Sequence, residues 1–229
     1  MTKILCIESA TSVCSVALVD GDTLCGVLTS GQLNDHAANL TVLANSLLEQ
    51  NGLTMKDMDA IAVSMGPGSY TGLRIGVSVA KGYCYAMDIP LIAINTLEIM
   101  AAGVAARFSG NTILCPMIDA RRMEVYTALY TADLIKIKET EAIILDDQSF
   151  ANELEKQEMV FFGNGAEKMA GFIENLPNAM ILYEYKISAA HMVQAAIHRF
   201  NTSQFEDVAY FEPFYLKDFV AGAPRVKGL

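Results

Sequence analysis

This chain of 229 residues has few residues of several types and lacks the sequence motifs of common hydrolases and of disulfide-rich secreted proteins. It has no tryptophan, only six prolines and only three histidines. Neither H-E-x-x-H nor G-x-S-x-G occurs, which argues against a zinc peptidase and a serine hydrolase. The cysteines are odd in number and form no C-x-x-C pair, so we expect reduced core thiols rather than disulfides or a zinc ribbon. They are Cys6, Cys14, Cys25, Cys84 and Cys115.

Positive charge and long apolar runs are also scarce. The chain has 16 basic residues against 26 acids, which gives a net charge of −10 and a pI near 4.7. Such a surface repels phosphate backbones, so we expect RNA to be reached only through a partner. No run of about 18 apolar residues is free of charges or breakers, so we expect no membrane contact. Residues 1–4 lack the layout of a signal peptide, and we expect a cytoplasmic protein.

The most informative segment that is present is a glycine-rich loop at residues 65–76, between a predicted strand and a predicted helix. Gly66 and Gly68 permit close approach of a ligand to the backbone, and Ser69 can cap the helix. Such an arrangement can aim N–H groups at an anion. The loop lacks the P-loop lysine and misses G-x-G-x-x-G by one residue. An anion site and a tight turn without a ligand therefore both stay open.

The predicted helix at 71–87 carries small residues at every fourth position. Gly72, Gly76, Ala80 and Cys84 therefore lie in one row on one face. Two glycines in a helix interior suggest the close approach of another backbone. The rest of the helix is apolar nearly all round, which is typical of burial on more than one side. The partner of the row is either the chain's own sheet or another subunit.

The order of predicted elements repeats along the chain, which is 52% apolar and has ample material for a core. The first half has strands at 4–8, 13–19, 23–30, 60–64 and 91–94, with helices at 34–50, 71–87 and 96–107. The second half has strands at 112–119, 124–130, 135–144 (broken near Lys138), 159–162 and 180–182, with helices at 147–157, 165–175 and 188–200.

Two βββαβα halves predict an α/β protein with the duplicated plan of the actin-like, Hsp70-like superfamily and a reduced second half. We place the halves at 1–109 and 110–229, with the last segment packing back on the first half. In that superfamily a nucleotide usually lies between the halves, which is an argument from fold alone. The residues that this plan places near a nucleotide or phosphate are Glu8, Ser9, Thr11, Gly66, Gly68 and Ser69.

Two charged residues each leave two interpretations open. Glu8 ends the first strand, where it can hold a metal-bound water or simply accept backbone N–H groups. Arg74 lies on the first turn of an apolar helix, where it can bind a partner's acid or a phosphate. It can also pair within the chain, with Glu8 or Glu98.

The histidines do not predict a metal site. His191 and His198 are seven residues apart on one predicted helix, too far to chelate one ion. We expect both to face solvent or the core. His36 opens the first long helix, where it is either an ordinary helix-start residue or a partner contact. We expect neither a metal site nor a catalytic residue in this chain.

The chain resembles the bacterial TsaB (YeaZ) family in residues 4–17, 66–76, 80–82, 89–91, 96–98, 119–121 with 124–126, and 213–217. The likeness is dense over residues 4–130 and sparse over 135–205. The family usually has Asp where this chain has Glu8. The resemblance implies a non-catalytic subunit that pairs with the transferase TsaD, joined by the ATPase TsaE. Together they make threonylcarbamoyladenosine next to the anticodon of tRNAs that read codons beginning with A.

The resemblance also implies how the complex divides its tasks. ATP and Mg²⁺ are used by the complex, and this chain holds no cofactor tightly. TsaD binds a metal with H-x-x-x-H, where this chain has Asn95–Ile99 without histidine. The first helix and the glycine-loop helix would pack against TsaD, or against a second copy when TsaD is absent. The expected partner-binding residues are His36, Leu40, Leu43, Leu47, Gly72, Arg74, Gly76, Ala80, Tyr83 and Cys84.

Two other functions compete with the scaffold. A small-molecule kinase or ATPase of the same fold is supported by the duplicated unit, by Glu8 and by a second glycine loop at residues 163–165. Its difficulty is the short second half, which leaves little room for an adenosine pocket. Tight binding or turnover of ATP by the chain alone would favour it. A metallopeptidase is the third hypothesis, and metal analysis tests it.

Overall fold

The computed structural model describes residues 1–30 and 36–217, with side chains of the first helix described from residue 39 onward. Two five-stranded sheets dominate the structure, and both have the same strand order and the same pattern of parallel and antiparallel pairs. This repetition confirms the predicted duplicated α/β fold. In the described part of the chain, no helix is both long enough and apolar enough to cross a bilayer.

The first sheet has central strands that are apolar on both faces, because helices cover each face. The central strand is β1 (Lys3–Glu8). It pairs antiparallel with β2 (Ser15–Asp20) and parallel with β4 (Ala60–Gly66), which leads into the glycine loop. In spatial order the strands are β3 (Thr23–Thr29), β2 (Ser15–Asp20), β1 (Lys3–Glu8), β4 (Ala60–Gly66) and β5 (Leu91–Asn95).

The second sheet repeats this order, and its two parallel strands on one side are only four residues long each. The predicted break near Lys138 is a shift in register opposite Leu129, and the strand continues through it. In spatial order the strands are β10 (Ala179–Leu182), β9 (Met159–Phe162), β6 (Ile113–Asp119), β7 (Glu124–Thr131) and β8 (Lys136–Ile144).

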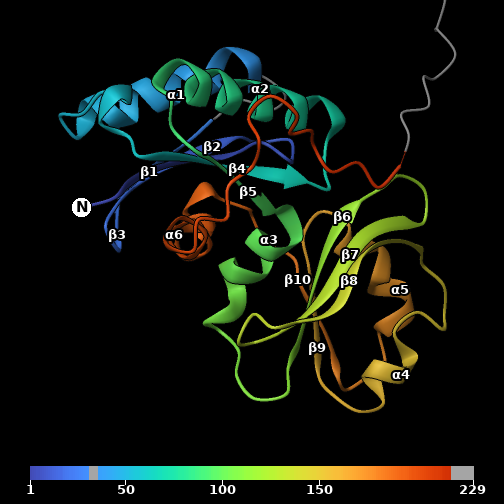
Figure 1. The fold of residues 1–229 in the computed structure, drawn as a ribbon. Helices are drawn as coiled ribbons and strands as arrows, with labels where there is room; N and C mark the ends of the chain where they lie inside the picture. The colour runs from blue at the N-terminus through green and yellow to red at the C-terminus, as the bar shows by residue number, and fades with distance from the viewer. Residues whose placement is uncertain (31–35, 218–229) are drawn as a thin grey trace, which may run out of the picture.

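Helices and sheets alternate in layers (Figure 1). α1 (His36–Gln50) and α2 (Tyr70–Met87) cover the outer face of the first sheet. Between the sheets lie α3 (Thr96–Ala105), the 3-10 turn η3 (Ala189–Met192) and α6 (Val193–Asn201). α4 (Ala151–Leu154), η2 (Ala166–Met169) and α5 (Ala170–Ile173) cover the outer face of the second sheet, and η1 (Met55–Asp57) precedes β4.

Three predicted helices of the second half are shorter than expected. The prediction of a helix over 147–157 is wrong except for the single turn of α4. Side chains of Asp146 and Ser149 bond to nearby backbone and to each other, which favours a turn over a helix. The helix expected over 165–175 is the turn η2 followed by four residues of α5, and that over 188–200 begins as η3.

The chain after α6 includes a segment, residues 206–217, that we call the C-terminal strap. The strap begins at the edge of the first sheet, where the Glu206 N–H donates to the Leu91 carbonyl at 2.9 Å. Phe211 is buried against the core under α2. The Phe214 N–H then donates to the Met65 carbonyl at 2.7 Å, next to the glycine loop. The strap thus runs back along the first half to the glycine loop (Figure 1).

Candidate functional site

A cleft of about 710 Å³ lies where loops of both halves meet, and we call it the interlobe cleft. One wall comes from the first hairpin and the glycine loop, at residues 10–12 and 67–71. The other wall comes from the second hairpin, at 118–122 and Glu124, with Tyr126 and Asn164. Residues 214–217 of the strap also line it. The carboxyl end of β4 leads into this site, as is usual for ligand sites in α/β folds.

The glycine loop is seated directly on the first hairpin. The Ser69 N–H donates to the Ala10 carbonyl at 2.7 Å, and the Ser69 hydroxyl caps α2 by accepting from Gly72 N–H at 3.2 Å. A Cβ on Gly68 would collide with the carbonyl oxygen of Ala10, so only glycine fits there. The Ser69 cap agrees with the expectation from the sequence, and Gly68 is required by a contact within the chain.

The six residues expected near a nucleotide do not all reach the cleft. Thr11, Gly68 and Ser69 line it, whereas Glu8, Ser9 and Gly66 lie behind its wall. Glu8 and Ser9 are fully buried, and the Ser9 hydroxyl donates to the Gly72 carbonyl at 2.9 Å. These three residues do not form the cleft surface, because β1 and β4 end inside the protein. Their proximity to a nucleotide or phosphate stays a prediction.

Among the carboxyl groups of the described structure, Glu8 has the most strongly shifted pKa. Its Oε1 accepts from Ala10 N–H at 2.6 Å, while its buried Oε2 has no hydrogen-bond partner of good geometry in the described part of the chain. Burial raises the pKa of the Glu8 carboxyl to about 7, and hydrogen bonds from Ala10 and Ser64 oppose this only in part. Glu8 thus accepts a backbone N–H, as its simpler interpretation predicted.

Two further titratable groups, both half-buried, lie between the sheets. Burial, and then the charge of Glu8, raises the pKa of Tyr185, whose hydroxyl lies 3.4 Å from His191 Nδ1. Burial lowers the pKa of His191. His198 is exposed, so the two histidines do not converge. Among the described residues, no group of three or more His, Cys, Asp and Glu side chains could hold a metal ion.

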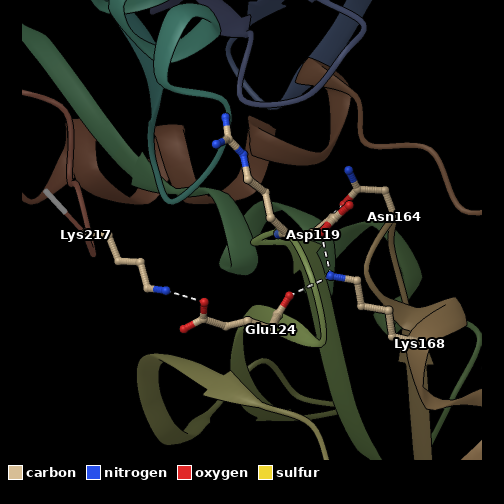
Figure 2. Close-up of polar contacts among 6 residues, drawn as sticks. Asp119, Glu124, Asn164, Lys168 and Lys217 are labelled. Atoms are coloured by element: carbon tan, nitrogen blue, oxygen red, sulfur yellow. Dashed lines mark hydrogen bonds and ion pairs between the residues drawn. The ribbon is translucent and has the colours of Figure 1, made fainter. Parts of the chain in front are cut away.

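The second wall is an ionic network (Figure 2). Lys168 Nζ lies 2.5 Å from Asp119 Oδ1 and 2.7 Å from the Glu124 carbonyl, while Asn164 accepts from Asp119 N–H at 3.0 Å. Lys217 of the strap pairs with the Glu124 carboxylate. Burial alone would raise the pKa of Asp119, but the Lys168 hydrogen bond and the turn's N–H lower it overall. The sequence did not point to either lysine as a partner of these acids.

Arg74 is used within the chain, although not as expected. Its guanidinium lies 4.3 Å from the centre of the Tyr70 ring, and its Nε donates to the Tyr215 hydroxyl at 3.3 Å. The two tyrosine rings are 5.0 Å apart. The predicted pairing of Arg74 with Glu8 or Glu98 is wrong, because Glu98 forms a bidentate pair with Arg199 at 3.0 and 2.8 Å.

The small-residue row of α2 faces the chain's own first sheet. A Cβ on Gly76 would overlap Ser9 Oγ, and the Cys84 thiol lies 3.5 Å from the Pro90 carbonyl. The partner-contact prediction is therefore wrong for six buried residues, and the core alternative is correct for them. They are Leu40, Leu47, Gly72, Gly76, Ala80 and Cys84.

The outward face of the same two helices carries different side chains. Arg74 is exposed, while Leu43 and Tyr83 are half-buried against the core. Val42 and Tyr85, which the sequence did not single out, are 59% and 86% exposed. The side chain of His36 lies outside the described residues, so its partner contact stays a prediction.

Two like sheets with a cleft between their loops place the chain in the class of actin-like α/β proteins. Component A of (R)-2-hydroxyglutaryl-CoA dehydratase from Acidaminococcus fermentans has this fold, with a TM-score of 0.53 and 9% identity over 89% of this chain and 100% of that one. The fold of this chain is more similar to a crystal structure of an uncharacterised Pseudomonas aeruginosa protein with similarity to peptidase YEAZ. Its TM-score is 0.78, with 24% identity over 95% of this chain and all of that one.

The sequence comparison defines the family. Residues 24–223 match the family described as TsaD, tRNA N6-adenosine threonylcarbamoyltransferase. The chain is 32% identical over 234 residues to the tRNA threonylcarbamoyladenosine biosynthesis protein TsaB of Escherichia coli (strain K12), covering 96% of each chain. The chain belongs to the TsaB (YeaZ) family.

Proposed function

We propose that this chain is the non-catalytic subunit that pairs with TsaD, and with TsaE, in threonylcarbamoyl modification of tRNA. The observation that carries the proposal is the match to the E. coli relative over 96% of both chains. ATP and Mg²⁺ would be used by the assembled complex, and tRNA would be reached through it. The acidic net charge of −10 supports this division, because an isolated chain of this charge repels RNA.

The outward face of α1 and α2 is the surface that best fits TsaD. Val42 and Tyr85 are large apolar side chains left in solvent, and Gly82 has open space above it. Exposed apolar residues that gather on one face mark interaction sites. The buried small-residue row of α2 contributes indirectly, because it fixes the helix on the first sheet and so determines which side chains face outward. A second copy would use the same face when TsaD is absent.

The start of α3 supports a non-catalytic role. The resemblance aligns this segment with the metal-binding histidines of TsaD, and here Asn95 caps the helix by accepting from Leu97 N–H at 2.9 Å. Thr96, Leu97 and Ile99 are buried in the interior. These positions are thus used for capping and packing.

Light scattering after size exclusion of the chain mixed with TsaD of the same organism tests the pairing. We expect a one-to-one complex, and we expect Tyr85→Asp to weaken it at least tenfold, because a charge would be buried in an apolar contact. Tyr183→Asp is the matched control, since Tyr183 is 63% exposed and follows β10 in the other half.

Two separate peaks at about 50 μM of each protein, where an affinity of roughly −6 kcal/mol would already give a complex, would contradict the proposal. Tight ATP binding or turnover by the chain alone would instead favour a kinase or ATPase of this fold.

A further inference from the structure

The interlobe cleft carries positive charge that the chain does not neutralise. Its two acids are already engaged, Asp119 by Lys168 and Glu124 by Lys217. Arg121 and Arg122 also line the cleft, and in the described structure neither guanidinium forms an ion pair with an acid. We call these two residues the arginine pair. Both are exposed, in a chain whose net charge is −10.

The backbone fixes where the arginine pair stands. Arg121 and Arg122 have φ values of +72° and +48°, a conformation that side chains other than Gly, Asn and Asp seldom adopt. Three hydrogen bonds close this turn: Arg121 N–H to Asp119 Oδ1, Glu124 N–H to the Arg121 carbonyl and Ala120 N–H to the Glu124 carbonyl. The Lys168 bridge then holds the turn onto the second sheet. Two adjacent guanidinium groups are therefore held at the edge of the cleft.

The opposite wall does not cancel this charge. Residues 10–12 and 67–71 include no acid and contribute the hydroxyls of Ser12, Ser69 and Thr71. The cleft is thus lined by donors from one side and by guanidinium groups from the other. Guanidinium binds phosphate oxygens in a bidentate geometry, which makes a phosphate the best-matched ligand.

We propose that Arg121 and Arg122 contact backbone phosphates of the RNA when this chain is part of its complex. The inference rests on the proposed function and adds to it the surface by which the subunit approaches tRNA. Exposed arginines on a hairpin tip suit a long polyanion that passes over the cleft. Elsewhere the acidic chain repels RNA, so a local basic edge also sets how the RNA is oriented.

The test compares two double variants of equal charge in the complex with TsaD. Arg121→Gln with Arg122→Gln removes the arginine pair. Arg107→Gln with Lys156→Gln removes two exposed cations outside the cleft. Filter binding of unmodified tRNA at several salt concentrations gives the affinity and its salt dependence, and light scattering confirms that each complex forms.

We expect the cleft variant to bind tRNA about tenfold more weakly than the control, with a salt slope smaller by about one to two, because two phosphate contacts are lost. Equal affinity and slope for both variants would overturn the inference while leaving the pairing with TsaD intact. Failure of the wild-type chain to pair with TsaD would instead contradict the proposed function.

A free phosphate compound is the other source of the same chemistry. If ATP or pyrophosphate raises the melting temperature of the wild-type chain but not of the cleft variant, and tRNA affinity is unchanged, the ligand is a small phosphate and the RNA assignment is overturned. If neither compound stabilises the chain and the tRNA affinity falls, the RNA assignment stands.

Discussion

At the scale of single residues, Glu8 makes stability depend on pH. Its pKa rises from 4.5 to about 7 on folding, so the folded state binds the proton more tightly. This favours folding at low pH and is lost as pH rises from about 4.5 through 7, by roughly 3 kcal/mol for a shift of this size. We expect Glu8→Gln to be more stable than wild type at pH 8 and to lose that advantage at pH 4.5.

Urea unfolding at the two pH values measures the effect, with the exposed Glu49→Gln as control. A stability difference between Glu8→Gln and wild type that does not change with pH would show that the buried carboxyl does not titrate in this range.

At the scale of one element, two of the three glycines in α2 have opposite surroundings. A Cβ on Gly76 overlaps Ser9 Oγ, whereas a Cβ on Gly82 meets nothing within 4 Å. We expect Gly82→Ala to stabilise the fold by about 1 kcal/mol through helix propensity. We expect Gly76→Ala to destabilise it by about 1–3 kcal/mol through overpacking. Thermal unfolding compares the two.

The same pair of variants tests which face of α2 is inside. If Gly76→Ala unfolds like wild type but loses its partner, the small-residue row faces TsaD and the buried assignment fails.

At the scale of the whole molecule, the C-terminal strap links the halves. It is anchored on the first half by Arg74 and by Lys81, whose Nζ donates to the Ala209 and Phe211 carbonyls at 3.2 and 2.9 Å. It reaches the second half through Lys217 and Glu124. We expect Lys217→Glu to speed amide hydrogen exchange in residues 206–217, because two acids would then repel each other at the cleft.

Adding Glu124→Lys to Lys217→Glu should restore slow exchange, since the pair is then reversed rather than broken. Exchange that stays fast in the double variant would mean that the contact does not hold the strap.

The sequence by itself determined the strands, the repeated order of elements and the loop at Gly66–Gly76. Continuous apolar runs such as Ile61–Val63 are typical of a strand covered on both faces, and a duplicated order of elements leaves few topologies. The Ser69 cap was also predictable, because it depends on neighbours three residues away. Two adjacent arginines in an acidic chain were visible as a signal but were not interpreted.

Only the tertiary structure decided which face of α2 is buried, that Glu8 is buried, and that Lys217 pairs with Glu124. A helix that is apolar nearly all round has no preferred inner face in its periodicity, so contact with Ser9 had to select one. The length of the helix expected over 147–157 likewise depended on the local competition at Asp146 and Ser149. The physical reason is the separation of the contacting residues along the chain, because contacts between distant residues leave no mark on the local sequence.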